Sequence, residues 1–413
     1  VIAGDYALPE LLAVRERVAG LQWVIGLPTD EGKATTAQLQ AVGVRPYGAV
    51  AGCDFRNEEF PGSDPDSPME LIYTSGTTGD PKGIVLTHRR YCETAKITPF
   101  LFGFRPDDRL YSGLSLTHAN AQVITLGTAL VNAIPCVLSR RFSKSRLWDI
   151  TRRYGCTNFT LLGGMTTAIY AEPPRPDDAD NPVRSIISAG MPAAIWREFS
   201  RRFNVELYEF YGAAEGGLTA NPPGVGPVGS IGKPIATLRH RIVDDDGNDV
   251  PQDANGERTG ELLFTNKDGT PFKVEYFRNP EASARKCAGG WLHMGDVVRE
   301  DRDGWLYFLY RKGSGIRRNG EFIDAACIEK VIAEVPAVDD VYVYGIPSVN
   351  GVPGEKDVVA AVVPKDPDLA AFDVQGLFRL CWQKLEPGYL PGCIQLLHQI
   401  PKPASEKPQD RFL

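Results

Sequence analysis

The chain has 413 residues, a formal net charge of −7, 43% hydrophobic residues and 23% charged residues. That composition is typical of a globular protein long enough for more than one domain, and no apolar run is long enough to predict a membrane span. The acidic balance gives no reason to expect nucleic acid as a partner. The eight cysteines include no Cys-x-x-Cys pair, which predicts free thiols in a reducing, cytoplasmic compartment without disulfides or zinc.

The chain begins with alternating short strands and helices, including a predicted helix over Leu11–Val18 and a strand over Trp23–Gly26. Farther along, Thr87 is the predicted N-cap of a helix that reaches about Phe102, and another helix opens within Ser115–Gln122. Strands and helices of similar length then alternate, which predicts α/β layers with largely parallel strands whose carboxyl ends hold ligands. The strands are Thr157–Leu162, Val183–Ser188 and Val205–Tyr211, and the helices are one capped by Ser143 and one over Ala193–Phe203.

Short strands and turns after Pro222 predict a small β subdomain. The last part, residues 316–413, predicts a compact α+β unit with helices over Ala326–Val335 and Asp373–Leu385. A boundary near Arg311 gives a large domain, residues 1–311, and a C-terminal domain, residues 312–413. The predicted fold class is therefore α/β, with a large N-terminal domain of layered α/β subdomains plus a small β subdomain, followed by an α+β C-terminal domain.

The run Tyr73–Gly83 combines three glycines, several hydroxyls and a lysine between two apolar runs typical of strands. Glycines let backbone N–H groups converge on one point, hydroxyls add donors, and Lys82 adds a positive charge suited to phosphate oxygens. A polyphosphate is the predicted ligand, and a glycine-rich hairpin turn is the structural alternative. A Walker loop is not favoured, because Lys82 follows Gly79 by three residues and strand-like residues come next.

This run resembles, nearly letter for letter, the phosphate-binding signature of the acyl-adenylate-forming enzymes. That superfamily contains acyl-CoA synthetases, peptide-synthetase adenylation domains and beetle luciferases, and the resemblance covers about residues 70–413 of this chain. It implies ATP binding by the residues of the loop and its ends. These are Thr74, Ser75, Gly76, Thr77, Thr78, Gly79 and Lys82.

The run Tyr211–Glu215 directly follows a predicted strand, and a carboxylate there suits Mg²⁺, which prefers one or two carboxylates plus phosphate oxygens. A solvated glutamate in a strand-ending turn is the alternative. The run resembles the family's Tyr-Gly-x-Thr-Glu, which implies that Tyr211 and Gly212 contact adenine and that Glu215 binds Mg²⁺. Ala214 replaces the family's threonine, and the loss of one hydrogen bond to a charged group costs about 1.5–3 kcal/mol.

Gly290–Asp296 resembles the family's Gly-Trp-x-x-Thr-Gly-Asp, with Met294 in place of the threonine. A carboxylate can accept hydrogen bonds from two ribose hydroxyls, which suits Asp296. Arg311 matches the family's ribose-contacting arginine at the domain boundary. Two further nucleotide-binding positions, Gly190 and Met191, match a strand end that lines the adenine site.

The segment Pro401–Lys407 resembles the family's Pro-Lys-Thr-x-x-Gly-Lys, with Pro403 and Glu406 as departures. The resemblance makes Lys407 the catalytic lysine, although an isolated lysine near a C-terminus is usually solvated. Its ammonium can bridge a substrate carboxylate oxygen and the α-phosphate while negative charge develops.

Softer matches concern the acyl and CoA sites. His118 matches a residue that gates the acyl pocket, with a helix-cap role as the alternative, and Gly163 and Gly164 match a strand end that lines the same pocket. Arg317 and Gly320 fall where the family builds its pantetheine tunnel. Gly313 takes the hinge position of a mobile C-terminal lid, where glycine allows a large backbone change at little steric cost.

The resemblance implies two steps: a carboxylic acid and Mg·ATP give an acyl-adenylate, and CoA then takes the acyl group. Residues 117–121 and 274–281 look most like crotonobetaine/carnitine-CoA and fatty-acid-CoA ligases. A carrier-protein acceptor, a luciferase-like oxidase and a catalytically impaired ATP-binding homologue stay open, as does a homodimer. The family also has a longer stretch before the phosphate loop, so part of the first subdomain is expected to be absent from this chain.

Overall fold

The structure is a computed structural model that describes residues 1–18, 20–29, 33–52, 62, 64–74, 82–312, 316–318, 321–323, 325–349, 356–401 and 413. The chain divides into two compact units, Val1–Ser63 and Asp64–Leu413, and each is described by itself. Within the described part, no helix combines the length and the apolar character needed to cross a membrane.

The N-terminal unit is a small parallel sheet in the order β1-β2-β3 with two helices. Leu8, Val24, Leu39 and Val44 form its core. The first helix starts earlier than predicted because Pro9 fits its first turn, where the missing N–H is not needed. The bounds are β1 (Ile2–Gly4), η1 (Asp5–Ala7), α1 (Leu8–Val14), η2 (Arg15–Arg17), β2 (Ile25–Leu27), α2 (Thr36–Ala41), β3 (Arg45–Pro46) and η3 (Tyr47–Ala49).

The second unit opens with the hairpin of β4 (Pro68–Thr74) and β5 (Lys82–Thr87), whose strands are antiparallel and pair Thr74 with Lys82. The prediction of two strands flanking the phosphate loop is therefore confirmed. The predicted N-cap is confirmed as well, since the Thr87 hydroxyl accepts the backbone N–H of Arg90 at 3.2 Å at the start of α3 (His88–Phe102).

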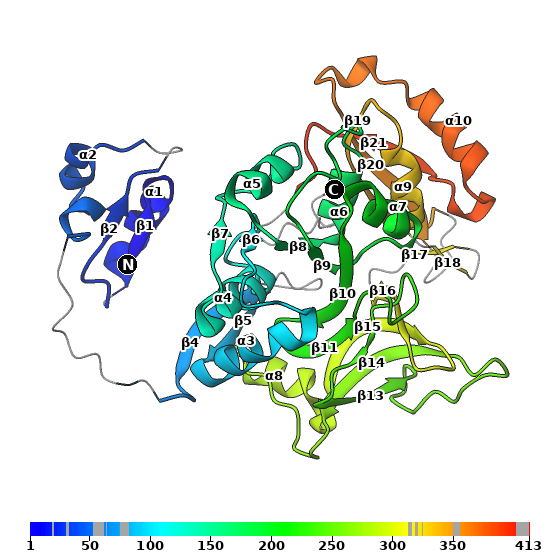
Figure 1. Ribbon diagram of the computed structural model, residues 1–413, viewed down its shortest axis with the longest axis horizontal. Coiled ribbons are helices and arrows are strands. Elements are labelled where there is room, and N and C mark those ends of the chain that lie inside the picture. The colour runs from blue at the N-terminus through cyan, green and yellow to red at the C-terminus, as the bar shows by residue number, and fades with distance from the viewer. Residues whose placement is uncertain are drawn as a thin grey trace. The chain divides into compact units, whose positions relative to one another are not determined.

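The central sheet runs in the order β12-β11-β10-β9-β8-β6-β7, and the strands from β10 to β7 pair in parallel, as predicted. Helices cover both faces (Figure 1). Ile186 packs with the layer of α5 to α7, and its neighbour Ile187 packs with the layer of α3, α4 and the π-helix η4, as the alternation of a strand requires. The strands are β6 (Leu110–Ser112), β7 (Cys136–Leu138), β8 (Asn158–Leu162), β9 (Ser185–Ala189), β10 (Glu206–Ala213), β11 (Gly216–Asn221) and β12 (Lys233–Pro234), and the helices are η4 (Asn120–Gly127), α4 (Thr128–Asn132), α5 (Leu147–Tyr154), α6 (Gly163–Tyr170) and α7 (Ala193–Phe203).

One local prediction in this region is wrong, and a second is confirmed with an unexpected helix type. The helix predicted to be capped by Ser143 begins only at Leu147, because Ser143 forms an earlier turn in which its carbonyl accepts the N–H of Arg146 at 3.2 Å. The helix predicted to open within Ser115–Gln122 is π-helical from Asn120, which periodicity cannot distinguish over so short a stretch.

The predicted small β subdomain is an antiparallel sheet in the order β13-β14-β15-β16, drawn to the right of β10 and β11 in Figure 1 and reaching below them. It packs closely against β11: at Gly217, which has φ +71°, a Cβ would lie 2.6 Å from Phe264 and 2.7 Å from the sulfur of Met294. Only glycine fits there, in both conformation and space. The bounds are β13 (Leu238–Val243), β14 (Arg258–Asn266), α8 (Pro280–Lys286), η5 (Ala288–Gly290), β15 (Leu292–Glu300) and β16 (Leu306–Arg311).

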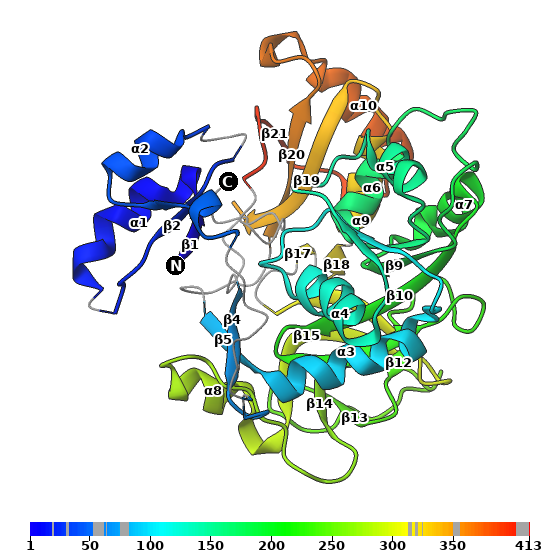
Figure 2. The ribbon, with the colours of Figure 1, turned by 60° about the vertical axis from the view of Figure 1, so that its left-hand side comes forward.

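The C-terminal part is the predicted α+β unit, in which α9 and α10 pack on one face of the sheet β19-β20-β21 (Figure 2). Val343 and Val358 face these helices, whereas Tyr344 and Val359 face the opposite side. The bounds are β17 (Ile316–Arg318), β18 (Glu321–Ile323), α9 (Ala325–Ala333), β19 (Val338–Pro347), β20 (Lys356–Pro364), η6 (Leu369–Ala371), α10 (Val374–Lys384), η7 (Pro387–Tyr389) and β21 (Cys393–Leu396).

Candidate active site

The β4–β5 hairpin is fastened to the segment that precedes α8. The N–H of Val85 donates to the carbonyl of Glu275 at 2.9 Å, and the N–H of Phe277 donates to the carbonyl of Gly83 at 2.7 Å. These bonds place the Lys82 ammonium 5.5 Å from the centre of the Tyr276 ring. Of the predicted phosphate-binding residues, Thr74 and Lys82 are the paired strand ends, and the others lie outside the described residues. Those are Ser75, Gly76, Thr77, Thr78 and Gly79.

Glu215 lies in the turn between β10 and β11 and is only 7% exposed. Its Oε1 accepts a hydrogen bond from the Tyr276 hydroxyl at 2.8 Å. Burial raises the pKa of Tyr276, and the negative charge of Glu215 raises it further. The predicted Mg²⁺ ligand is therefore a buried carboxylate with one oxygen held by a phenol that stays protonated.

Two cations that the sequence did not point to lie close to Glu215. Arg90 donates from Nη2 to the carbonyl of Ala214 at 2.7 Å, and Lys286 donates from Nζ to the carbonyl of Met294 at 3.4 Å. Burial lowers the pKa of both side chains, while the Glu215 carboxylate opposes the shift in each case. The two carbonyls belong to the residues that replace the family's threonines. Ala214 and Met294 each therefore have a cationic side chain hydrogen-bonded to their backbone carbonyl.

Asp296, Arg311 and Tyr211 come from separate sequence motifs and meet in one cluster. Arg311 donates to Asp296 through Nε at 2.7 Å and Nη2 at 3.1 Å, and the Tyr211 hydroxyl donates to Oδ2 at 2.5 Å. Asp296 is only 1% exposed. The pairing of β15 with β16 sets Asp296 directly opposite Arg311, so the register of the sheet builds the ion pair.

The cluster is electrostatically consistent and nearly saturated. Hydrogen bonding to Asp296 raises the pKa of Arg311, and burial together with the Asp296 charge raises the pKa of Tyr211. A carboxylate has about four acceptor sites, and three are used here. One acceptor site on Asp296 is therefore left for a ribose hydroxyl. A second hydroxyl could donate to Asp296 only if Tyr211 moved away.

The predicted adenine-lining pair is held by a carboxyl that sequence reasoning missed. The N–H of Gly190 donates to Glu209 Oε1 at 2.6 Å, and the N–H of Met191 donates to Oε1 and Oε2 at 3.2 and 3.1 Å. Burial raises the pKa of Glu209 to about 8, although these N–H groups act in the opposite direction. Glu209 therefore shapes the turn after β9, where Gly190 has φ +100°.

The predicted acyl-pocket residues follow neighbouring strands of the same sheet. His118 comes after β6, and Gly163 and Gly164 open α6 directly after β8. His118 Nδ1 accepts the backbone N–H of Asn120 at 3.1 Å. This bond at the start of a helix fits the helix-cap role, which was the alternative to gating the acyl pocket. Gly190 comes after β9 and Gly212 lies near the end of β10, so these predicted residues lie at or after the carboxyl ends of strands in one sheet.

The residues predicted for the lid are described only in part. Gly313, Gly320 and Lys407 lie outside the described residues, and the backbone of Arg317 pairs with Phe322 in the β17–β18 hairpin. Immediately before the predicted hinge, Lys312 donates to Glu261 at 2.8 Å and contacts Asp245 at 3.0 Å. The chain is thus tied to the small β subdomain up to residue 312.

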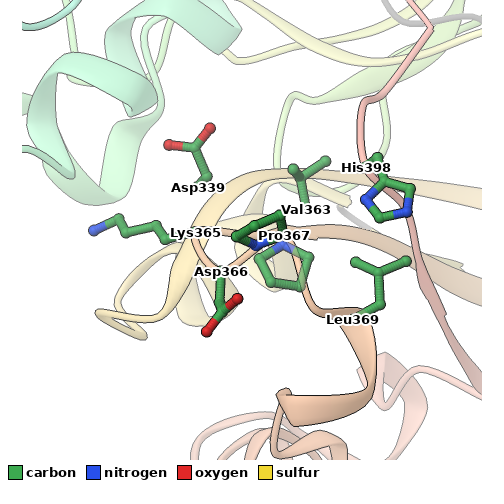
Figure 3. Close-up of a pocket in the computed structure, with 8 residues that line it drawn as sticks. Asp339, Val363, Lys365, Asp366, Pro367, Leu369 and His398 are labelled. Carbon is green, nitrogen blue, oxygen red and sulfur yellow. The ribbon is translucent and has the colours of Figure 1, made fainter.

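In the described part of the chain, no three His, Cys, Asp or Glu side chains gather into a metal centre. Glu215 offers one carboxylate, and Mg²⁺ needs no more than one or two when phosphate oxygens complete its coordination. A pocket of about 410 Å³ lies in the C-terminal part, with Asp339 and Lys365 at one side and His398 at the other (Figure 3). The predicted site residues are not among those that line it.

The described fold is of the α/β class, with a small antiparallel sheet and an α+β C-terminal part. Residues 7–268 match the family model for AMP-binding enzymes, and residues 327–407 match the model for the AMP-binding enzyme C-terminal domain. The chain therefore belongs to the AMP-binding enzyme family.

Curated relatives in this family are named as ligases and transport proteins. The chain is 32% identical to the medium/long-chain-fatty-acid–CoA ligase FadD17 of Mycobacterium marinum, over 87% of this chain and 70% of that protein. It is 33% identical to the steroid-22-oyl-CoA synthetase of Rhodococcus jostii, over 75% and 56%. It is 31% identical to the human long-chain fatty acid transport protein 1, over 83% and 55%. The chain thus spans between about half and about two thirds of these relatives.

Solved structures share the fold at lower identity. The anthranilate CoA ligase AuaEII with anthranoyl-AMP matches with a TM-score of 0.76 and 24% identity, over 100% of this chain and 76% of that chain. The Bacillus subtilis o-succinylbenzoate coenzyme A synthetase with ATP and magnesium matches with a TM-score of 0.71 and 24% identity, over 98% and 81%. These matches support the predicted fold class.

Proposed function

We propose that the protein is an AMP-forming acid–thiol ligase, which activates a carboxylic acid with Mg·ATP and passes the acyl group to CoA. The observation that carries this proposal is the buried cluster of Asp296, Arg311 and Tyr211 beside Glu215, where the end of β10 meets the small β subdomain. Several curated relatives are named as CoA ligases or synthetases, which supports the same activity.

Each group of residues has a part in nucleotide binding. Asp296 and Arg311 bind the ribose, and Tyr211, Gly212 and the Gly190–Met191 turn form the adenine side. The loop from Thr74 to Lys82 binds the phosphates. When bound by Glu215, Mg²⁺ neutralises phosphate charge. Arg90 fixes the Glu215 turn through the Ala214 carbonyl.

The first chemical step is an in-line displacement. An oxygen of the substrate carboxylate bonds to the α-phosphorus of ATP while the bond to the pyrophosphate oxygen breaks, and Lys407 stabilises the negative charge that develops. In the second step the CoA thiol loses its proton, its sulfur bonds to the acyl carbon, and AMP leaves. A turn of the lid about Gly313 withdraws Lys407 and presents Arg317 and Gly320 to CoA.

Pyrophosphate exchange into ATP tests the first step with a panel of carboxylic acids. At least one acid should support exchange, and exchange with none of them contradicts the proposed activity. Lys407→Ala should abolish adenylation and leave thioester formation from a supplied acyl-adenylate largely intact. Equal loss in both half-reactions contradicts the role given to Lys407.

The acyl acceptor needs its own experiment, because carrier-protein loading is the second candidate for that step. Products formed with CoA are compared with products formed with a phosphopantetheinyl carrier. A thioester of CoA is expected, and exclusive loading of the carrier contradicts the ligase proposal. The domain boundary at residues 311 and 312, a homodimer and a cytoplasmic location stay predictions.

A further inference from the structure

Asn120 carries a buried carboxamide that is left unsatisfied. Its side chain belongs to a residue that is only 5% exposed, and neither Nδ2 nor Oδ1 has a hydrogen-bond partner among the described residues. In that part of the chain, Asn120 is the one side chain with two such atoms. Burying an amide without partners is costly, and native structures normally avoid it. An orphaned amide therefore indicates a group reserved for something that binds.

The backbone of Asn120 is bonded to His118, a predicted acyl-pocket residue, whose Nδ1 accepts the Asn120 N–H at 3.1 Å. Asn120 begins the π-helix η4, and π-helical segments are frequently found at functional sites. Its neighbour Ala119 packs on the same cluster as Ala214, next to the Glu215 turn. Its other neighbour, Ala121, packs with Leu162 at the end of β8. The residues on either side of Asn120 thus belong to the cores beside the Glu215 turn and beside the strand end that precedes Gly163 and Gly164.

Two buried amides elsewhere in the sheet have bonded donors, although Oδ1 of Asn221 also lacks a partner among the described residues. Asn221 in β11 is 2% exposed, and its Nδ2 donates to the carbonyls of Pro227 and Ser230, both at 3.0 Å. In the orientation that satisfies both of its atoms, the Asn158 carboxamide in β8 donates to Asp108 at 2.8 Å and accepts from the Ser185 hydroxyl at 2.5 Å. The fold therefore satisfies amide donors where they serve the scaffold, and it leaves the donor of Asn120 open.

We propose that the Asn120 carboxamide hydrogen-bonds a polar group on the acyl chain of the substrate. The preferred acids would then carry a hydroxyl, ketone or amide in addition to the reacting carboxylate. This inference rests on the proposed function and makes Asn120 a specificity-determining residue. A carboxamide has both donors and an acceptor, so it can bind any of these groups. A plain alkyl acid leaves the amide unpaired, which is the situation in which polar sites discriminate most strongly.

The first experiment compares matched acids in pyrophosphate exchange. Hexanoate, octanoate and decanoate are each set against hydroxy, oxo and amide derivatives substituted at successive carbons. The best polar acid should exceed its alkyl parent by about tenfold in kcat/KM, because one well-placed hydrogen bond supplies a discrimination of that order. Equal or better activity with every alkyl parent overturns the proposal.

The second experiment replaces the amide with a side chain of similar size. Asn120→Leu should erase or invert the preference for the polar acid. It should also raise the Tm of the substrate-free protein, because an unpaired buried amide is removed. Asn120→Ala serves as a second variant if the leucine does not fit. Asn221→Leu is the matched control, which should lower Tm and leave the acid preference unchanged.

A structural role for Asn120 predicts the opposite pattern. A Tm of Asn120→Leu that falls as far as that of Asn221→Leu, or an unchanged acid preference in Asn120→Leu and Asn120→Ala, overturns the inference. The change in Tm caused by the acids without ATP tests the Asn120 inference separately from the proposed ligase activity. If no acid supports exchange but polar acids raise the Tm of the wild type and not of Asn120→Leu, the ligase proposal fails and the Asn120 site stands. If they raise neither, both fail.

Discussion

Polar groups on the proposed nucleotide side of the site and on the proposed acyl side differ in how they are hydrogen-bonded. On the nucleotide side, Asp296 accepts three hydrogen bonds, Glu209 holds two backbone N–H groups, and Glu215 is bonded to Tyr276. On the acyl side, Asn120 has neither of its side-chain atoms bonded within the described ranges. The side proposed to bind ATP has these three carboxyl groups already bonded, and the side proposed to bind the acid keeps an unbonded amide.

This difference has an energetic basis. Groups that are oriented in advance need no reorganisation when ATP binds or charge develops, so their bonds stabilise the fold and the transition state together. An open amide destabilises the free protein and is compensated only by a ligand that can bond to it. The contrast can be tested by substitutions that each remove one hydrogen-bonding or charged partner from the proposed nucleotide side.

The largest effect is expected from Arg311→Leu. This substitution leaves the Asp296 carboxylate buried beside a single phenol, and removing one partner of a buried ion pair costs about 3–5 kcal/mol. Because the Arg311 side chain is 40% exposed, the lower end of about 3 kcal/mol is expected. Chemical denaturation without nucleotide measures the loss.

Arg285→Leu provides the control for that prediction. Arg285 pairs with Glu281 at 3.8 Å on the same subdomain, but the two side chains are 71% and 87% exposed. An exposed pair of this kind contributes less than about 1 kcal/mol. Similar losses in the two variants would show that Asp296 is not the organised centre described above.

Tyr276→Phe should have the next largest effect. It removes the donor to Glu215 Oε1, and a hydrogen bond to a charged group contributes about 1.5–3 kcal/mol to stability. The freed carboxylate is less well oriented, so the Mg²⁺ concentration needed for half-maximal exchange should rise. Tyr307→Phe loses a bond of 3.1 Å to Asp301 and should leave the Mg²⁺ dependence unchanged. An unchanged Mg²⁺ dependence in Tyr276→Phe would separate Tyr276 from metal binding.

The scaffold of the site was largely predictable from the sequence. Helix α7 was predicted with its observed bounds, because Ile195, Phe199 and Phe203 recur at helical spacing and are buried. The strand before Tyr211 and the strands flanking the phosphate loop were predicted from apolar runs bounded by glycines. Local pattern and turn chemistry decide these elements, so a single sequence contains the necessary signal.

The partners within the site were not predictable in the same way. Asp296 and Arg311 were named separately, but their direct pairing depends on the register of β15 against β16. Lys286, Arg90 and Glu209 were missed, because each contacts a backbone group brought near by tertiary packing. Asn120 gave even less signal, since what distinguishes it is the absence of bonds within the described structure.

A smaller effect is expected from Lys286→Met, which keeps the apolar stem and removes the charge. The ammonium lies near Glu215 and Asp296 and donates only weakly, at 3.4 Å, to the Met294 carbonyl. Its loss should raise the KM for ATP about fivefold, roughly 1 kcal/mol, with a larger effect at low salt. Lys267→Met, at an exposed position of the same subdomain, should change neither the KM for ATP nor its dependence on salt. An unchanged KM in Lys286→Met would show that the cation serves the carboxylates alone.

The smallest effect at neutral pH is expected from Glu209→Gln, which sharpens the comparison through its pH dependence. The folded protein keeps a proton on Glu209 up to a pKa of about 8, whereas an unfolded glutamate loses it near about pH 4.3. Between those values the folded state binds more protons, so this group's contribution to stability falls as pH rises and levels off above pH 8. Glutamine mimics the protonated acid and keeps an acceptor for the Gly190 N–H.

The free energy of unfolding of Glu209→Gln should therefore fall less steeply with rising pH than that of the wild type. Glu206→Gln, exposed on the same strand, is the control and should keep the wild-type slope. Parallel curves for the wild type and Glu209→Gln would mean that the turn holding Gly190 and Met191 rests on a carboxylate that is charged throughout.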